Sequence, residues 1–138
     1  MITSVCDTKW INLPKISDPR GHLTFLESGN HVPFDIKRLF YLYGIGLGEK
    51  RGAHAHKNLH QLIIATSGKF DLVVDDGLNK LRFSLNNPYS AIYVPPMLWG
   101  DLESFSSDAV CMVVASDVYV ESDYIRDYQE YLEAKGVK

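Results

Sequence analysis

The side chains best suited to chemistry lie close together in one segment of the 138-residue chain. A single alanine separates His54 from His56, and His60 follows four positions later. In an extended strand, residues two apart point to the same face, so we expect the imidazoles of His54 and His56 to lie side by side. Two neighbouring imidazoles, which titrate near neutral pH, can bind a metal ion or transfer protons. The spacing by itself leaves both chemistries open.

The segments around these histidines have the pattern of short β-strands. Apolar and polar residues alternate over 70–75 and 81–85, and β-branched or aromatic runs occupy 36–43, 59–66, 91–94 and 109–116. Clusters of Gly, Pro, Asn, Asp and Ser separate these runs at short intervals. This spacing predicts about eight or nine short strands in an all-β sandwich or barrel.

The C-terminal end has a different period. Five residues fall on one stripe of a helix: Tyr124, Ile125, Tyr128, Tyr131 and Leu132. Ser122 or Asp123 can cap the start of this helix, and Gly136 suits the left-handed position that follows its end. We therefore predict one short C-terminal helix after the strands.

Length and composition favour one globular domain, which we expect to span 1–138. The 14 basic and 17 acidic residues give a net charge of −3, so no bulk charge attracts nucleic acid. No window approaches the roughly 18 apolar residues of a membrane span, and the N-terminus lacks the apolar stretch of a signal peptide. The two cysteines, Cys6 and Cys111, are far apart in the sequence, and we expect reduced thiols and a cytoplasmic protein.

The spacing of the histidine segment resembles the first motif of the cupin superfamily. It contains Gly48, five residues, His54-x-His56, four residues, Gln61, six residues and Gly68. The resemblance implies a cupin-type antiparallel β-sandwich or jelly-roll barrel. The second cupin motif would fall on 95–100, where Gly100 occupies the place of its histidine.

Metal-binding cupins use three histidines and one carboxylate, and this chain keeps two of those four positions. Gln61 is a neutral amide in the place of the carboxylate, and Gly100 has no side chain. Neither residue can hold a divalent cation, so we expect no metal and no other cofactor. The remaining metal hypothesis is an iron- or manganese-dependent cupin that recruits His60 beside His54 and His56.

Two further strings resemble the cupins that act on nucleotide sugars. They are Asp18-Pro-Arg20-Gly-His22 and Arg51-Gly-Ala-His54. The resemblance implies that Arg20 and Arg51 hold the diphosphate of a dTDP-sugar and that a histidine removes a proton next to a carbonyl. A guanidinium group offers a fixed fork of donors that matches phosphate oxygens.

Strings along nearly the whole chain resemble the dTDP-6-deoxyhexose 3,4-ketoisomerases. They are Ile36-Lys-Arg-Leu-Phe-Tyr41, Arg51-Gly-Ala-His-Ala-His56, Tyr93-Val-Pro-Pro-x-x-Trp99, Phe105-Ser-Ser-Asp108 and Ser122-Asp-Tyr-Ile-Arg-Asp127. This resemblance implies that the substrate is dTDP-4-keto-6-deoxyglucose and that its ketone moves from C4 to C3 without a cofactor. The product would be a dTDP-3-keto-6-deoxyhexose for the deoxyamino sugar of a surface glycan.

The resemblance also implies roles for individual residues. His54 and His56 would carry the proton transfers, with Tyr41 as an auxiliary hydrogen-bond donor. The sugar or thymine would contact Gln61 and the apolar face of Trp99. His22 and Gly100 are the positions at which we expect the pocket to influence whether the product has the galacto or the gluco configuration.

Three alternatives stay open besides a ketoisomerase. They are a 3,5-epimerase-like enzyme, a cupin that binds a nucleotide sugar without converting it, and the metal-dependent cupin described above. The family that the chain resembles forms homodimers, commonly by exchange of N-terminal strands. We therefore expect a homodimer in which the segment 10–13 takes part in the exchange.

Overall fold

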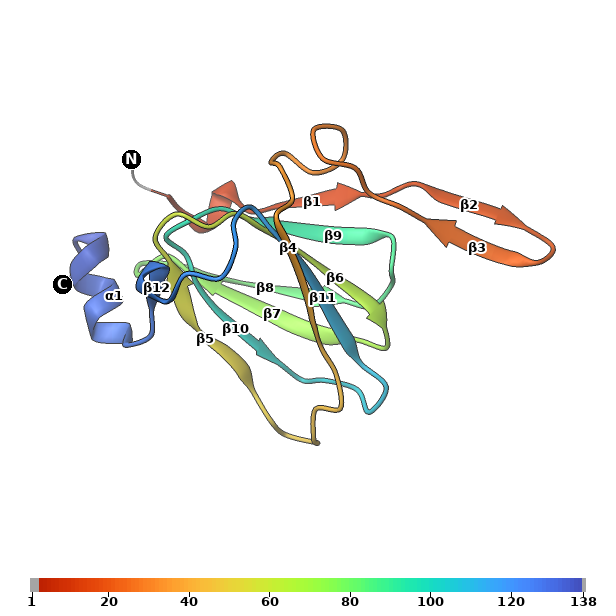
Figure 1. The fold of residues 1–138 in the computed structure, drawn as a ribbon. Helices are drawn as coiled ribbons and strands as arrows, with labels where there is room; N and C mark the ends of the chain where they lie inside the picture. Colours follow the sequence, from red (N-terminus) through yellow and green to blue (C-terminus); the bar gives the residue numbers. More distant parts are fainter. Residues whose placement is uncertain (1–2, 138) are drawn as a thin grey trace.

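The computed structural model describes residues 3–137, which form two antiparallel sheets packed face to face and a separate hairpin (Figure 1). The first sheet has the strand order β1 (Lys9–Asn12), β9 (Ser90–Val94), β6 (Gln61–Ser67), β11 (Val110–Ala115) and β4 (Arg38–Leu42). The second has the order β12 (Tyr124–Ile125), β5 (Arg51–His56), β10 (Trp99–Glu103), β7 (Phe70–Asp75) and β8 (Lys80–Leu85). The predicted all-β class is confirmed.

Alternating side chains of both sheets fill the space between them. From β7 the buried residues are Phe70, Leu72 and Val74, and the facing sheet contributes Ile63 and Val113. Their burial removes apolar surface from water, which is the main driving force that holds the two sheets together. Cys111 is a free, buried thiol within this core, as the sequence predicts.

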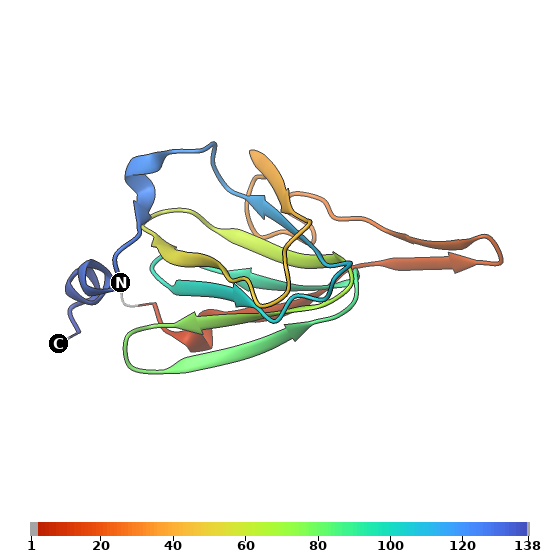
Figure 2. The ribbon, with the colours of Figure 1, turned by 90° about the horizontal axis from the view of Figure 1, so that it is seen from below.

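The hairpin extends away from the two sheets. It consists of β2 (Lys15–Asp18) and β3 (Gly21–Thr24), and most of its residues are exposed. Figures 1 and 2 show it pointing away from the body of the molecule, on the side opposite the C-terminus. A two-stranded hairpin without a packed face is marginally stable in water, so this element calls for a partner surface.

The C-terminal helix is shorter than predicted. Helix α1 covers Tyr128–Lys135, its N-cap is Asp127, and Gly136 ends it in the left-handed conformation. The predicted caps were wrong, because Ser122 and Asp123 belong to a 3-10 turn (η2, Glu121–Asp123) and the next two residues form β12. The backbone there pairs with β5, which competes with helix formation. A second short 3-10 turn, η1 (Val5–Asp7), precedes β1.

Buried hydrogen bonds attach α1 to the second sheet. The Tyr131 hydroxyl, which is fully buried, donates to the carbonyl oxygens of Asp75 and Met97, each at 2.9 Å. The Tyr128 hydroxyl donates to the Asp75 carboxylate at 2.7 Å. Within residues 3–137, no helix combines the length and the apolar character that crossing a bilayer requires.

Candidate active site

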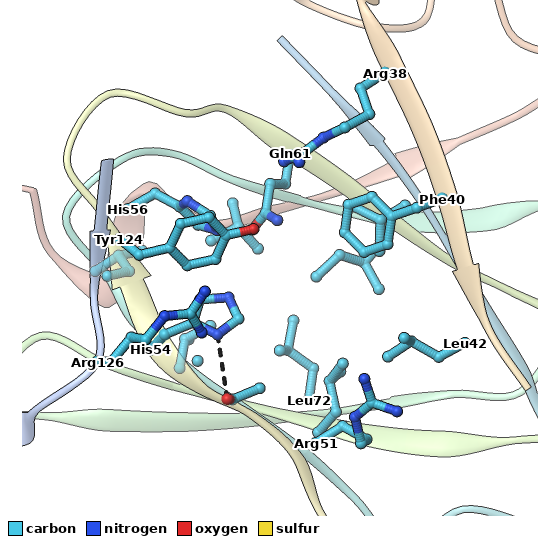
Figure 3. Close-up of a pocket in the computed structure, with 18 of the residues that line it drawn as sticks. Arg38, Phe40, Leu42, Arg51, His54, His56, Gln61, Leu72, Tyr124 and Arg126 are labelled. Atoms are coloured by element: carbon cyan, nitrogen blue, oxygen red, sulfur yellow. Dashed lines mark hydrogen bonds between the residues drawn. The ribbon is translucent and has the colours of Figure 1, made fainter. Parts of the chain in front are cut away.

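A cavity of about 390 Å³ opens between the two sheets, and residues of the Ile36–Tyr41, Arg51–His56 and Ser122–Asp127 motifs line it (Figure 3). Strands β4, β5, β6, β10 and β12 contribute its polar wall, and apolar core residues form its floor. Its polar and aromatic lining residues are Arg38, Phe40, Arg51, His54, His56, Gln61, Tyr119, Tyr124 and Arg126. Five predicted site residues therefore come together: Arg51, His54, His56, Gln61 and Gly100.

A bulge in β5 places Arg51 on the same side as the histidines. In a regular strand Arg51 would face away from His54, because they are an odd number of positions apart. Opposite Gly100 and Asp101, however, the pairing jumps from His54 to Gly52, so Ala53 is an extra residue. Its φ of 59° is in the left-handed region, which bends the strand. The guanidinium group and both imidazoles consequently reach one cavity.

Two glycines keep the strands β5 and β10 close together and the cavity open. A Cβ on Gly52 would lie 2.9 Å from the carbonyl oxygen of Gly100, so the glycine allows the two backbones to approach. At Gly100 a Cβ would meet only Leu72, at 3.9 Å. Gly52 thus has a packing role, whereas Gly100 leaves free volume inside the pocket.

His56 is held in one tautomer by a carboxylate. Its Nδ1 lies 3.2 Å from Oδ2 of Asp123, which only accepts when ionised, so Nδ1 carries the proton and donates. The Nε2 atom is then the lone-pair nitrogen, and it is buried without a hydrogen-bond partner in the described chain. A base whose second nitrogen is oriented by a carboxylate is a recurring arrangement in proton-transfer enzymes.

His54 lies beside His56 and has a similar orientation. Its Nδ1 donates to the carbonyl oxygen of Gly52 at 3.1 Å, which leaves its own Nε2 as an acceptor. The two rings have centroids 4.9 Å apart and are nearly perpendicular. The predicted pairing of the imidazoles on one face is confirmed.

Burial keeps both imidazoles neutral. Loss of solvent lowers the pKa of His54. Burial, together with the proximity of His54, lowers the pKa of His56 to about 4, although Asp123 partly opposes this shift. At neutral pH each ring therefore has a free lone pair that can accept a proton.

Three residues named in the sequence analysis do not line the cavity of this chain, because strand alternation or helix packing turns them away from it. Tyr41 is on β4 but points outward and is 56% exposed, while its neighbour Phe40 lines the cavity. Trp99 packs under α1, with its ring 5.2 Å from that of Tyr128. His60 faces the outer side of its sheet and bonds the Tyr93 hydroxyl at 2.7 Å. The auxiliary role expected for Tyr41 and the ligand contact expected for Trp99 are therefore not supported by these positions.

Arg20 and His22 also lie outside the cavity, on the projecting hairpin. Arg20 forms an exposed ion pair with Asp18 at 2.7 Å, and His22 bonds the Ser17 hydroxyl at 2.7 Å. Neither residue lines the cavity of its own chain. Within residues 3–137, no group of three or more His, Cys, Asp or Glu side chains is arranged to hold a metal ion.

The sequence reasoning missed several residues of the segment 119–126, which closes one side of the cavity. Tyr124 packs against both histidine rings, with centroids 5.0 Å from His54 and 4.3 Å from His56. Arg126 lies over the Tyr124 ring at 4.1 Å and forms an ion pair with Glu121 at 2.9 Å. Hydrogen bonds from Arg126 and Tyr119 lower the pKa of Glu121 to about 2. The string Ser122-Asp-Tyr-Ile-Arg-Asp127 was the available signal.

Arg38 is the other residue that was missed. It belongs to the Ile36–Tyr41 string, but that string gave no reason to separate Arg38 from its exposed neighbour Lys37. In the structure Arg38 lines the cavity together with Phe40 and Leu42, which are two and four positions further along β4. The alternation of an edge strand thus supplies three lining residues at once.

This fold and this site define a cupin-type protein with a cavity built for acid–base chemistry: two neutral imidazoles, one of them oriented by a carboxylate, beside arginine side chains. A family model described as "FdtA: WxcM-like, C-terminal" matches residues 6–136. The chain belongs to this family.

Relatives of known activity agree with this assignment. The TDP-4-oxo-6-deoxy-alpha-D-glucose-3,4-oxoisomerase of Aneurinibacillus thermoaerophilus is 42% identical over 125 residues, which cover 91% of this chain and 90% of that protein. The WlaRB TDP-quinovose 3,4-ketoisomerase from Campylobacter jejuni has a similar structure, with a TM-score of 0.89 and 41% identity over 94% of this chain and 99% of that one.

A third relative has been solved with a substrate. It is a histidine-to-asparagine variant of the 3,4-ketoisomerase QdtA from Thermoanaerobacterium thermosaccharolyticum, in complex with TDP-4-keto-6-deoxyglucose. Its TM-score is 0.93 and its identity 32%, with 96% of each chain covered. The predicted cupin-type fold and the predicted family are confirmed.

Proposed function

We propose that this protein is a TDP-sugar 3,4-ketoisomerase that moves the ketone of TDP-4-keto-6-deoxyglucose from C4 to C3. The observation that carries the proposal is the pair His54 and His56 in the cavity, with the unpartnered Nε2 of His56 and the Asp123 carboxylate behind it. The activities of the relatives support the same substrate and reaction.

The reaction needs only proton transfers. Nε2 of His56 removes the proton from C3, the electrons of that bond form a C3–C4 double bond, and the carbonyl π electrons move onto O4. The proton of the C3 hydroxyl is transferred to O4, a proton is delivered to C4, and a carbonyl forms at C3. C3 is oxidised and C4 reduced within one molecule, so no external electron acceptor takes part.

The two histidines then have different roles. His56 is the base, because its Nδ1 donates to a carboxylate that stabilises the imidazolium formed when Nε2 accepts a proton. His54 has only a carbonyl behind it, and its Nε2 serves the exchange between the sugar oxygens. Gln61 bonds the sugar, and Arg51 contacts the diphosphate.

The diphosphate site is completed by a second copy of the chain. Strand β4 is the open edge of its sheet, and Leu39, Tyr41 and Tyr43 are exposed there. The hairpin likewise exposes Ile16 and Leu23. Pairing of one copy's hairpin with β4 of the other copy would cover both apolar surfaces. Because β4 lines the cavity, this pairing would also bring Arg20 and His22 of the hairpin toward the cavity mouth.

The configuration of the product depends on which face of C4 receives the proton. Gly100 leaves an open volume beside His54, with which it is paired across β5 and β10. In the dimer His22 of the second copy would be the donor nearest to the open side of the cavity. We propose these two positions as the determinants of a galacto or a gluco product.

Proton NMR in D₂O with TDP-4-keto-6-deoxyglucose tests the activity. We expect one deuterium to appear at C4 of the product, a carbonyl at C3, and coupling constants that report the C4 configuration. His56→Asn should reduce turnover by at least about 10²-fold without unfolding the chain. Wild-type turnover in both His54→Asn and His56→Asn would refute the assignment.

The same spectra separate the alternatives. A 3,5-epimerase would incorporate deuterium but leave the ketone at C4. A cupin that only binds would show ligand line broadening without any exchange. Metal analysis of the purified protein tests the third alternative, because an iron- or manganese-dependent cupin should contain about one equivalent of that metal per chain. A cytoplasmic location fits the two free thiols, Cys6 and Cys111.

A further inference from the structure

Arg38 differs from most arginines of this chain because nothing compensates its charge. Arg20, Arg82 and Arg126 form ion pairs with acidic side chains, whereas no carboxylate of residues 3–137 lies within ion-pair distance of Arg38. Its Nε is buried without a hydrogen-bond partner in the same residues. Arg38 is half-buried, and even partial burial of a cation without a counterion is unfavourable, so an anionic group that arrives with the ligand would explain why it is kept.

The position of Arg38 relates this charge to His56. The two side chains and Tyr124 line both the active-site cavity and an adjoining polar cavity of about 340 Å³. Figure 3 shows the Arg38 side chain reaching toward Gln61, at the end of the pocket that holds His56, whereas Arg51 lies at the other end. The pocket therefore has a separate cationic group at each end.

Aromatic rings hold the Arg38 guanidinium group in place. Its Cζ lies 5.2 Å from the centroid of the Phe40 ring and 5.6 Å from that of Tyr119. Cation–π contacts of this kind fix an arginine without using its N–H donors. The donors of Arg38 stay free to bind an oxygen anion.

We propose that Arg38 is a catalytic residue that binds the negatively charged oxygen of the enediolate. This inference rests on the proposed isomerisation. When His56 removes the C3 proton, the C4 carbonyl becomes an enolate and its oxygen gains a negative charge. Both imidazoles begin the reaction neutral. Arg126 also lines the cavity but is paired with Glu121, so Arg38 is the cation near the base that has no acidic partner within the described residues.

Each bond that breaks when His56 removes the C3 proton is matched by a bond that forms. The C3–H bond breaks and an Nε2–H bond forms on His56, while the C4–O4 π bond opens and the C3–C4 π bond forms. Arg38 keeps its protons and supplies only hydrogen bonds to O4. When the proton of the C3 hydroxyl reaches O4, the negative charge moves to O3, and it is neutralised when C4 receives a proton and the C3 carbonyl forms.

Steady-state kinetics with Arg38→Gln and Arg38→Lys, together with the affinity for TDP, test this role. Removal of one preorganised donor for a developing oxygen anion typically lowers kcat by about 10²–10³-fold. We expect Arg38→Gln to lower kcat by that factor with TDP affinity unchanged, and Arg38→Lys to lose less. In Arg38→Ala, added methylguanidinium should restore part of kcat.

Lys37→Gln is the matched control, because it removes the same charge from the adjacent, exposed position and should keep wild-type kinetics. If Arg38→Gln instead weakens TDP binding with kcat unchanged, the arginine binds the diphosphate and the inference is wrong. Unchanged kcat and TDP affinity also refute it. If Arg38→Gln does not fold, Arg38→Lys and the rescue of Arg38→Ala decide. If the wild type does not move the ketone, the proposed function is wrong. If the wild type is active and the Arg38 variants behave otherwise than expected, only the inference about Arg38 is wrong.

Discussion

The two histidines are chemically alike in sequence but different in their surroundings. Asp123 stands behind His56, whereas a backbone carbonyl stands behind His54. A carboxylate favours the protonated form of its partner more than a neutral carbonyl does. This difference is our reason for proposing His56 as the proton acceptor and His54 as its hydrogen-bonding neighbour. The spacing of the two histidines in the sequence does not reveal it.

The depressed pKa of His56 has a consequence for the pH dependence of the reaction. A base is active in its deprotonated form, and a pKa lowered from 6.5 to about 4 keeps His56 deprotonated until the solution is clearly acidic. We therefore expect kcat/KM to stay constant as the pH falls through 6.5 and to decline only as the pH approaches the pKa of His56, which is about 4.

NMR titration of labelled histidine provides the control for this prediction. His54→Asn removes an imidazole that becomes charged only in acid, together with part of the burial, so the pKa of His56 should rise toward 6.5. A decline of kcat/KM centred at or above pH 6.5 in the wild type would contradict the prediction.

At the scale of elements, the segment after β11 completes the site. The turn η2 presents Asp123, whose second carboxylate oxygen accepts from the backbone N–H of Asn58 at 2.8 Å. The following β12 pairs with β5 at Ala55 and His56. The base and its orienting carboxylate are therefore fixed to each other through both backbone and side chain.

Replacement of this carboxylate tests its positioning role. In Asp123→Asn the side chain can still accept from Asn58, so the fold should persist. Loss of the negative charge should lower kcat by on the order of 10²-fold, because the imidazolium loses its partner. Since Asp123 raises the pKa of His56, the acid limb of kcat/KM should also move to lower pH.

The control for this variant is Asp117→Asn, a change in the same loop. Asp117 is exposed and its carboxylate caps only the backbone N–H of Val118. Equal losses of kcat in the two variants, or an Asp123→Asn acid limb at higher pH, would show that the carboxylate only holds the loop.

At the scale of the whole molecule, the cavity and the hairpin belong to one site only if two copies meet. Figure 2 shows the hairpin projecting from the body of the molecule, and Arg20 and His22, which it carries, do not line the cavity of their own chain. The proposed exchange between two copies would account for both the projecting hairpin and the exposed edge of β4. Sedimentation should accordingly show a dimer.

Mixed dimers give a sharper test of this exchange. Arg20→Ala and His56→Asn should each be poorly active at low substrate concentration. If the hairpin serves the other copy, each hybrid dimer has one site with both residues intact, and a randomly reassembled mixture should recover roughly a quarter of wild-type activity. No recovery in a mixture shown to contain hybrids would place Arg20 in the site of its own chain or outside any site.

The sequence predicted the fold well because its signals are local. Alternation over 70–75 and the turn residues between strands identify an antiparallel sandwich without knowledge of the partners. The predicted start of the C-terminal helix was wrong. The positions of Tyr124 and Ile125 fit the apolar stripe of a helix as well as a two-residue strand, and only their pairing with β5 decides between the two.

From the sequence alone we could place together the candidate residues that one strand supplies, but not those that come from several elements. His54 and His56 follow from the geometry of a single strand. Arg38 and Asp123 come from elements that are distant in sequence. Tyr41 faces away from the cavity of its own chain because the side chains of β4 alternate. Recognition of such residues requires the register between strands, which depends on packing between residues far apart in the chain.

The extra residue in β5 makes the chemistry of this pocket sensitive to chain length at one position. Inserting one residue between Arg51 and the bulge would reverse the alternation before it, so the strand could keep its ladder and its imidazoles while the guanidinium group of Arg51 turned toward the outside. A homologue with this insertion would then look intact in its fold and keep its pair of imidazoles, yet lose the proposed contact between Arg51 and the diphosphate. Length variation at this site would therefore separate binders of charged sugars from relatives that act on neutral ones.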